Sequence, residues 1–397
     1  DALALRVAEF HAGVAVAGPE SVHGRPAAVQ APVEENFSQV LACMQDPRER
    51  ELLVPLQDWT RQADRDLQTV LQARKDGGFI RECHGDLHLR NVALVDEVPV
   101  AFDCIEFNDN LRWIDIISEV AFMVMDLDHR GQPGLASRFL NAWLERNGDY
   151  AGLSLLRWYL VYRAMVRAKV DCLRAHQADV ETGEREAILQ DYHAYIELAG
   201  RYTHTAPPLL LLMHGLSGSG KTTISQYLLE GLPAIRMRSD IERKRLHGLA
   251  GDARSGAGIE EGIYDRAAGE RTYQHLAELA GTVLDAGHSV IVDAAFLSQA
   301  QRAPFIELAR ARGVRCFIID CQAPESELRR RITERQDKRQ DASEAGIEVL
   351  ENQLRTYQPL SASEQGADVL VAGSDAAAMA ELVATLRARL RKAKQGV

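Results

Sequence analysis

Residues 209–224 read LLLLMHGLSGSGKTTI, and no other segment limits the possible folds of this protein so strongly. The fixed positions of the pattern G-x-x-x-x-G-K-[ST] are filled by Gly215, Gly220, Lys221 and Thr222. The apolar run before the glycines predicts a strand, and the spacing of apolar residues after them predicts a helix. A glycine-rich loop between a strand and a helix is typical of a phosphate-binding site. A chance Gly/Ser turn is the alternative, and the strand–loop–helix context favours the phosphate site.

The chemistry of phosphate binding explains each residue type in this loop. Glycines let backbone N–H groups turn toward phosphate oxygens, and the following helix directs its positive end at the same anion. Lys221 is expected to reach the β- and γ-phosphates, and the Thr222 hydroxyl is expected to bind Mg²⁺. The expected nucleotide-binding residues are Gly215, Ser217, Gly218, Ser219, Gly220, Lys221, Thr222 and Thr223. The sequence therefore predicts ATP and Mg²⁺ as cofactors.

The length and the charge distribution of the chain point to two dissimilar halves. A chain of 397 residues exceeds what one hydrophobic core usually supports, so two domains are expected. Residues 209–397 carry 25 Lys and Arg against 25 Asp and Glu, so the whole net charge of −11 lies in residues 1–208. An acidic first half disfavours a broad nucleic-acid-binding face there.

The cysteines and the apolar runs indicate the cellular compartment in which the protein is expected. The six cysteines form no C-x-x-C pair, and we expect no histidine partner at metal-ligand spacing. Reduced, buried thiols in a cytoplasmic protein are the predicted state. No apolar run approaches the roughly 18 residues of a membrane span, so no membrane partner is expected.

Periodicity predicts a largely helical half followed by an α/β half. Helical patterns are expected within 1–75, at about 114–127, 135–146, 153–176 and 184–199, with a hairpin over 91–102. The break at 201–208 sets the expected domains at 1–204 and 205–397. Strand-like runs at 209–213, 234–238, 288–293, 314–320 and 367–371 alternate with helices. This alternation predicts a five-stranded parallel sheet, with the ligand at its carboxyl edge.

Two acidic residues beyond the loop are candidates for chemistry. Asp240, about 20 residues past the loop, is a candidate base for an attacking hydroxyl, and Arg243 lies one turn further on to hold the acceptor. The alternative is that Ser239 or Asp240 caps the helix and that Arg243 is a solvated charge. Asp293 closes the apolar strand Val290–Val292, as expected of a residue that orders Mg²⁺ through water or touches the acceptor. A plain turn-forming aspartate is an equally good interpretation.

A basic helix follows the fourth predicted strand. Arg331, Arg335 and Arg339 recur at a spacing of four and therefore share one helix face. An arginine directed at the phosphates contributes about 10³–10⁵ in rate, whereas a positioned base contributes about 10²–10⁴. A solvated basic helix is the alternative.

Together these features resemble the P-loop kinase group that includes polynucleotide 5′-hydroxyl kinases, gluconate kinase, chloramphenicol phosphotransferase and zeta-type toxins. The resemblance covers about residues 209–373. It implies that Asp240 is the acceptor-side base, that Arg243 is an acceptor ligand, and that Arg331 and Arg335 are lid arginines. It also implies phosphoryl transfer to a hydroxyl, without naming the acceptor.

The first half carries a second constellation, His84-Gly-Asp86 followed by Asn91 and then Asp103. An aspartate five residues before an asparagine, with another aspartate across a hairpin, is typical of a metal-assisted phosphoryl-transfer site. The pattern resembles the motif of aminoglycoside and choline phosphotransferases. That likeness implies that Asp86 is the catalytic base and that Asn91 and Asp103 bind metal.

One part of that family pattern is missing from the first half. Residues 1–83 contain a single lysine, Lys75, and no glycine-rich loop before a strand, so the amino lobe that clamps nucleotide is not found. We expect either that this lobe precedes Asp1 or that the half is silent, in which case Asp86→Asn leaves activity unchanged. The order of halves resembles bacterial fusions of an aminoglycoside-phosphotransferase-like domain with an ATP-binding kinase.

The expected function is a cytoplasmic, ATP-dependent kinase acting on the hydroxyl of a small molecule. A polynucleotide 5′-hydroxyl kinase is the second choice, and a nucleotide-gated regulatory module with little turnover is the third. Arg163 and Arg167, one helical turn apart, could serve an anionic substrate, although a packed basic stripe is the favoured interpretation.

Overall fold

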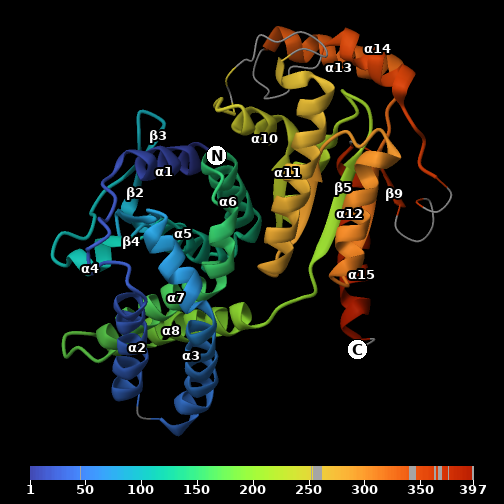
Figure 1. Cartoon of the computed structure of the whole chain (residues 1–397). Helices are drawn as coiled ribbons and strands as arrows, with labels where there is room; N and C mark the ends of the chain where they lie inside the picture. Colours follow the sequence, from blue (N-terminus) through green and yellow to red (C-terminus); the bar gives the residue numbers. More distant parts are fainter. Residues whose placement is uncertain are drawn as a thin grey trace. The chain divides into compact units, whose positions relative to one another are not determined.

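The computed structural model describes residues 1–44, 46–251, 253, 262–338, 346–361, 364, 369–373 and 375–395. These residues form two compact units (Figure 1). The first contains residues 1–143 and 152–205, and the second contains residues 144–151 and 206–397.

The first unit is mainly helical, as the periodicity predicts. Its helices are α1 (Ala2–Gly13), α2 (Pro26–Cys43), α3 (Pro47–Asp76), α4 (Asp109–Arg112), α5 (Ile116–His129), most of α6 (Pro133–Asn147), α7 (Leu153–Ala175) and α8 (Thr182–Thr203). Helix α5 is buried on every side from Ile116 to Leu127 and packs against α7, so it forms the centre of this unit. Its first turn is capped by Asp115, whose carboxylate accepts from the Ile117 N–H (3.0 Å).

Two small antiparallel sheets complete the first unit. Strands β2 (Val92–Val95) and β3 (Val98–Ala101) form the expected hairpin. The turn residues Asp96 and Glu97 both have positive φ, as a tight two-residue hairpin turn requires. Strands β1 (Ile80–Glu82) and β4 (Trp113–Asp115) pair across the chain and were not expected from the sequence.

The second unit is built on a five-stranded parallel sheet, which confirms the predicted fold class. The strands are β5 (Leu209–His214), β6 (Ala234–Arg238), β7 (Ser289–Asp293), β8 (Arg315–Cys321) and β9 (Val369–Ala372), in the order β6-β7-β5-β8-β9. The first strand in sequence therefore lies in the middle, and all six of its residues are buried. Continuous apolar sequence is what a strand needs when helices cover both of its faces.

Helices cover both faces of this sheet (Figure 1). Helices α9 (Lys221–Gly231) and α15 (Ala376–Gln395) share a core with Leu209, Leu211 and Met213 on one face. Helices α11 (Arg266–Asp285) and α12 (Gln299–Ala311) pack against strands β7 and β8. The remaining helices of the unit are α10 (Ser239–Leu246), α13 (Glu325–Lys338) and α14 (Ile347–Thr356). The order of strands reverses at β5, so the loop after β5 opens at the carboxyl edge where α/β sheets bind ligands.

Candidate active site

The loop between β5 and α9 has a backbone that only glycine accommodates. Gly215, Gly218 and Gly220 all have positive φ, at 140°, 82° and 92°. A Cβ atom at Gly215 would lie 2.5 Å from the Cys321 carbonyl oxygen, and one at Gly218 would lie 2.8 Å from the Leu328 carbonyl oxygen. Gly215 and Gly218 are thus required by close backbone neighbours as well as by the turn.

Lys221 folds back onto this loop from the first turn of α9. Its Nζ donates to the carbonyl oxygens of Gly215 (2.9 Å) and Leu216 (2.8 Å). Burial lowers the pKa of this lysine, while the charges of Asp293 and Asp240 act in the opposite direction. These two carboxylates therefore lie close enough to Lys221 to affect its pKa.

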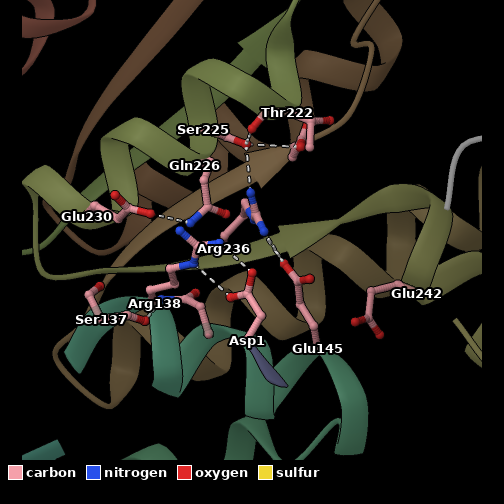
Figure 2. A network of polar contacts seen from close by, with 12 residues as sticks. Asp1, Ser137, Arg138, Glu145, Thr222, Ser225, Gln226, Glu230, Arg236 and Glu242 are labelled. Carbon is pink, nitrogen blue, oxygen red and sulfur yellow. Dashed lines mark hydrogen bonds and ion pairs between the residues drawn. The ribbon is translucent and has the colours of Figure 1, made fainter. Parts of the chain in front are cut away.

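A hydrogen-bonded network joins α9 to the middle of β6 and to the end of β7 (Figure 2). Asp293 ends β7, is buried, and has its Oδ2 atom 3.1 Å from Ser225 Oγ. Figure 2 shows Ser225 one turn after Thr222 on α9, with Arg236 of β6 donating to the Ser225 hydroxyl (3.4 Å). Arg236 also donates to Glu145 Oε1 (2.9 Å), in the 144–151 segment of the same unit.

These residues fit the expected magnesium ion. Thr222 and Asp293 offer a hydroxyl and a carboxylate oxygen, which are the ligand types that Mg²⁺ prefers. The Asp293 carboxylate is held by Ser225, one turn from Thr222 on the same helix. When bound, the ion would neutralise charge on the phosphates that the loop holds.

Asp240 and Arg243 form an ion pair at the start of α10. Arg243 Nη1 donates to Asp240 Oδ1 (3.2 Å), and its guanidinium lies 5.1 Å from the centre of the Tyr264 ring. The residue that caps α10 is Arg238, and no side chain makes a capping hydrogen bond there. The capping interpretation of Asp240 therefore does not describe this structure, and its carboxylate remains a candidate for the acceptor side.

Helix α13 brings arginines to the loop. Arg331 Nη1 donates to the Gly218 carbonyl oxygen (3.4 Å), and its Nε donates to Glu327 (2.6 Å). The charge of Arg335 acts on the pKa of Lys221, so this side chain also lies near the lysine. Arg339 lies outside the described residues.

Sequence analysis did not identify one contact at the loop. The Ser217 N–H, which is expected to face phosphate, donates to Gln353 Oε1 of α14 (2.8 Å). No local signal marks this glutamine, because its position depends on the packing of α14 more than 130 residues from the motif. Of the remaining loop residues, Ser219 donates its N–H to the Leu216 carbonyl oxygen (3.2 Å), and Thr223 lies in the first turn of α9.

In the first unit, the structure brings Asp86 and Asn91 together. Asn91 Nδ2 donates to Asp86 Oδ2 (3.1 Å), and His88 Nε2 lies 3.3 Å from the same oxygen. Burial raises the pKa of Asp86, but His88 and the charge of Arg163 outweigh that effect, so the net shift is downward. Asp103 is exposed with a φ of 62°, one residue after Phe102, whose N–H donates to the Asn91 carbonyl.

Buried residues hold the turn of the His84-Gly-Asp86 motif. Gly85 has a φ of 86°, and its N–H donates to Glu119 Oε1 (2.8 Å) of α5. Arg163 of α7 donates to the Gly85 carbonyl (3.1 Å) and to Ser118 (3.1 Å). Arg163 is therefore a buried positioning residue, in agreement with the packed interpretation rather than with an anion site. Glu119 carried no signal in the sequence, since it lies 34 residues from the glycine that it orients.

Two family models match the chain, one in each half. Residues 1–156 match the phosphotransferase enzyme family. Residues 210–360 match the AAA domain, and this range contains the glycine loop and the acidic and basic residues around it. The chain is thus a fusion of a phosphotransferase-family segment with a P-loop domain. The sequence resemblance to such a fusion is confirmed.

Similar proteins are found both among curated sequences and among solved structures. An uncharacterized protein of Mycobacterium tuberculosis and one of Mycobacterium bovis are each 33% identical over 276 residues, which is 70% of this chain and 54% of the relative. The chain spans about half the length of these curated relatives. Among solved structures, a putative kinase from Chloroflexus aurantiacus is 23% identical with a TM-score of 0.38, over 48% of this chain and 99% of that one. The APS kinase of Mycobacterium tuberculosis, solved in complex with AMPPNP and APS, is 20% identical with a TM-score of 0.33, over 47% of this chain and 99% of that one.

No helix in the described part of the chain is both long enough and apolar enough to cross a lipid bilayer.

Proposed function

We propose that the second unit is an ATP- and Mg²⁺-dependent kinase that transfers the γ-phosphoryl group to a hydroxyl of a small molecule. One observation carries this proposal: Lys221 of α9 and Arg331 of α13 both donate hydrogen bonds to carbonyl groups of the glycine loop. A lysine and an arginine held at the same glycine loop are what phosphoryl transfer needs, because the reaction develops negative charge there.

The acidic residues divide into two roles in this proposal. Asp293 orders Mg²⁺ together with Thr222, and Asp240 accepts the proton of the attacking hydroxyl. The ion pair with Arg243 holds Asp240 in one orientation, which suits a base that must lie within hydrogen-bond reach of its substrate. The lid arginines Arg331 and Arg335 then stabilise the transferring group.

A small acceptor is favoured by the charge of residues 209–397. Their 25 basic and 25 acidic residues give no net positive charge to attract a nucleic acid. A cytoplasmic location is part of the proposal, and all six cysteines of the structure are free of disulfide bonds. The matches to a phosphotransferase family and to a P-loop domain support the reaction class.

The test is transfer of label from γ-labelled ATP, with Mg²⁺, to a panel of hydroxyl acceptors that includes a 5′-hydroxyl oligonucleotide. We expect one small acceptor to be labelled and Lys221→Ala to abolish the transfer. Asp240→Asn is expected to lower the rate by about 10²–10⁴-fold. A matched control is Asp285→Asn, a surface carboxylate paired with Arg312, which we expect to leave the rate unchanged.

Two outcomes would replace this proposal. Labelling of the oligonucleotide alone, with binding that weakens steeply as salt rises, would make the unit a polynucleotide kinase. Tight nucleotide binding with slow hydrolysis that is insensitive to Asp240→Asn would make it a nucleotide-gated regulatory module.

A further inference from the structure

Three potential metal ligands lie together in the first unit. The Sγ atoms of Cys43 and Cys172 and the Nδ1 atom of His176 all lie within 4.8 Å of one another. Cys43 is the last residue of α2, Cys172 lies in the last turn of α7, and His176 follows that helix. None of the motifs described above includes these residues.

The sequence expectation that no cysteine has a histidine at metal-ligand spacing is wrong at this point. Cys172 and His176 are four residues apart, a spacing that places both side chains on one face of a helix end. The third ligand, Cys43, is 129 residues away in sequence. Only the packing of α2 against α7 brings it to the pair, so the complete cluster could not be identified from spacing alone.

The distances between these ligand atoms would fit a tetrahedrally coordinated metal ion after a small movement of the side chains. Cys43 Sγ lies 3.1 Å from His176 Nδ1. Zinc bonded to sulfur and nitrogen in a tetrahedral site holds those two atoms about 3.5 Å apart, given typical Zn–S and Zn–N bond lengths. His176 Nδ1 is also 2.9 Å from the Cys172 carbonyl oxygen, and ligation would replace that hydrogen bond, with the ring proton on Nε2.

The surroundings of the cluster match those of a metal site. Cys172 is fully buried, Cys43 is partly buried and His176 is exposed, which provides a path from solvent to the ligands. The nearby Glu49 carboxylate is buried and accepts hydrogen bonds from Tyr192 Oη (2.9 Å) and His193 Nε2 (2.8 Å).

We propose that Cys43, Cys172 and His176 bind one Zn²⁺ ion, or a similar thiophilic divalent cation, with the fourth position open to water. Binding releases the two thiol protons to solvent, and the two thiolates then balance the charge of the ion. The ion would tie the end of α2 to the end of α7. Because α7 also carries Arg163, the site would stabilise the helix that supports the Gly85 turn.

The test uses the reduced full chain after treatment with a chelator. Titration calorimetry with Zn²⁺ is expected to show one ion per chain. Co²⁺ is expected to give the thiolate-to-metal absorption bands of a tetrahedral cysteine site. Cys43→Ser and His176→Gln change partly buried or exposed side chains and are expected to fold. Each should weaken Zn²⁺ binding by about 100-fold or more, since losing even an outer partner costs 10–100-fold. The matched control is Cys104→Ser, an exposed cysteine outside the cluster, which should bind as the wild type does.

Three results would overturn the proposal. The first is the absence of Zn²⁺ binding by a folded wild-type chain, and the second is equal binding by the wild type and Cys43→Ser. The third is a Cys43–Cys172 disulfide found by mass spectrometry after mild oxidation, in a chain whose reduced form binds no Zn²⁺. That third outcome would identify the cluster as a redox pair instead.

Discussion

Two neighbouring arginines of α13 share the partner Glu327 but differ in a second contact. Arg331 also reaches the Gly218 carbonyl of the phosphate loop, whereas Arg330 also pairs with Glu334 of its own helix. Exposed ion pairs of the second kind contribute little, typically under about 1 kcal/mol. An arginine at the transferring phosphoryl group contributes far more, because it meets charge that develops in the transition state.

Arg331→Ala is therefore expected to lower the turnover number by about 10³-fold or more, with a smaller change in the KM for ATP. Arg330→Ala, which removes the same charge one residue away, should change the turnover number by less than about two-fold. Steady-state kinetics of the two variants measure the difference directly. Equal effects of the two substitutions would show that Arg331 acts only through the net charge of the helix.

Site residues could be predicted from the sequence where a local motif fixes them. They could not be predicted where contacts with distant elements determine their role. The loop residues Lys221 and Thr222 follow from a local pattern whose chemistry allows few substitutes. Glu119 and Arg163 hold Gly85 from α5 and α7. Glu119 has no local signal, and the spacing of Arg163 with Arg167 indicates a packed basic stripe but not the contact with Gly85, which is far away in sequence. The roles of the individual site residues stay predictions until the variants are measured.

Helix α13 packs so closely on the phosphate loop that position 218 has no room for a side chain. Its φ is 82°, and an added Cβ would lie 2.8 Å from the Leu328 carbonyl and 3.2 Å from the Leu328 Cα. Both neighbours are backbone atoms, so neither can rotate away. An alanine here would have to displace the loop or the helix.

Gly218→Ala is expected to destabilise the second unit by about 1–3 kcal/mol and to weaken ATP binding. Gly269→Ala is the matched control: it lies in α11 with no atom within 4 Å of an added Cβ. That change should be neutral or stabilise the unit by about 0.5–1 kcal/mol. Thermal unfolding and ATP titration measure both effects, and wild-type behaviour of Gly218→Ala would contradict the close approach.

A buried ion pair joins α12 to the segment before β9. Arg302 is completely buried, and its Nε donates to Glu364 Oε1 (2.6 Å), while its Nη1 donates to the Phe296 carbonyl (2.7 Å). The hydrogen bond from Arg302 lowers the pKa of Glu364 from 4.5 to about 2. Because the folded pKa lies below the unfolded one, the pair stabilises the fold above about pH 4.5 and loses that effect as the pH falls toward 2.

Glu364→Gln should lower the free energy of unfolding by about 3–5 kcal/mol at pH 7, since it leaves a buried guanidinium without its counter-charge. The difference from the wild type should shrink below about pH 4, where the wild-type pair also weakens. Urea unfolding at pH 7 and at pH 3.5 measures both values. Glu307→Gln, which breaks an exposed pair with Arg310, is the control and should cost under about 1 kcal/mol. If Glu364→Gln lowered the free energy of unfolding equally at both pH values, the effect of Glu364 would come from packing and not from its charge.

Elements were predictable where the sequence repeats a period over many residues. The five strands of the sheet follow long apolar runs, and the helices of the first unit follow a period near 3.6. Strands β1 and β4 have three residues each, too few to show alternation, and they form because Ile80 pairs with Asp115 across 35 residues. Pairing between residues so far apart leaves no recognisable pattern in the local sequence.

The two units of the molecule differ in their tryptophan content, so fluorescence can distinguish them. The four tryptophans are Trp59, Trp113, Trp143 and Trp158, and all of them lie in the first unit. Tryptophan fluorescence therefore reports unfolding of the first unit, whereas calorimetry reports both. Each unit has its own buried residues, so we expect two transitions on heating.

Mg·ATP is expected to stabilise only the unit that binds it. At a free concentration of 100 times Kd, a ligand adds about 2.7 kcal/mol to the stability of its binding unit. For a unit of nearly 200 residues this corresponds to a rise in Tm of roughly 5–10 °C. We expect that rise in one calorimetric transition and not in the tryptophan fluorescence midpoint, because the phosphate loop lies in the unit without tryptophan. Lys221→Ala should remove the rise. A fluorescence midpoint that rises with Mg·ATP even in Lys221→Ala would instead place a nucleotide site at Asp86 and Asn91 of the first unit.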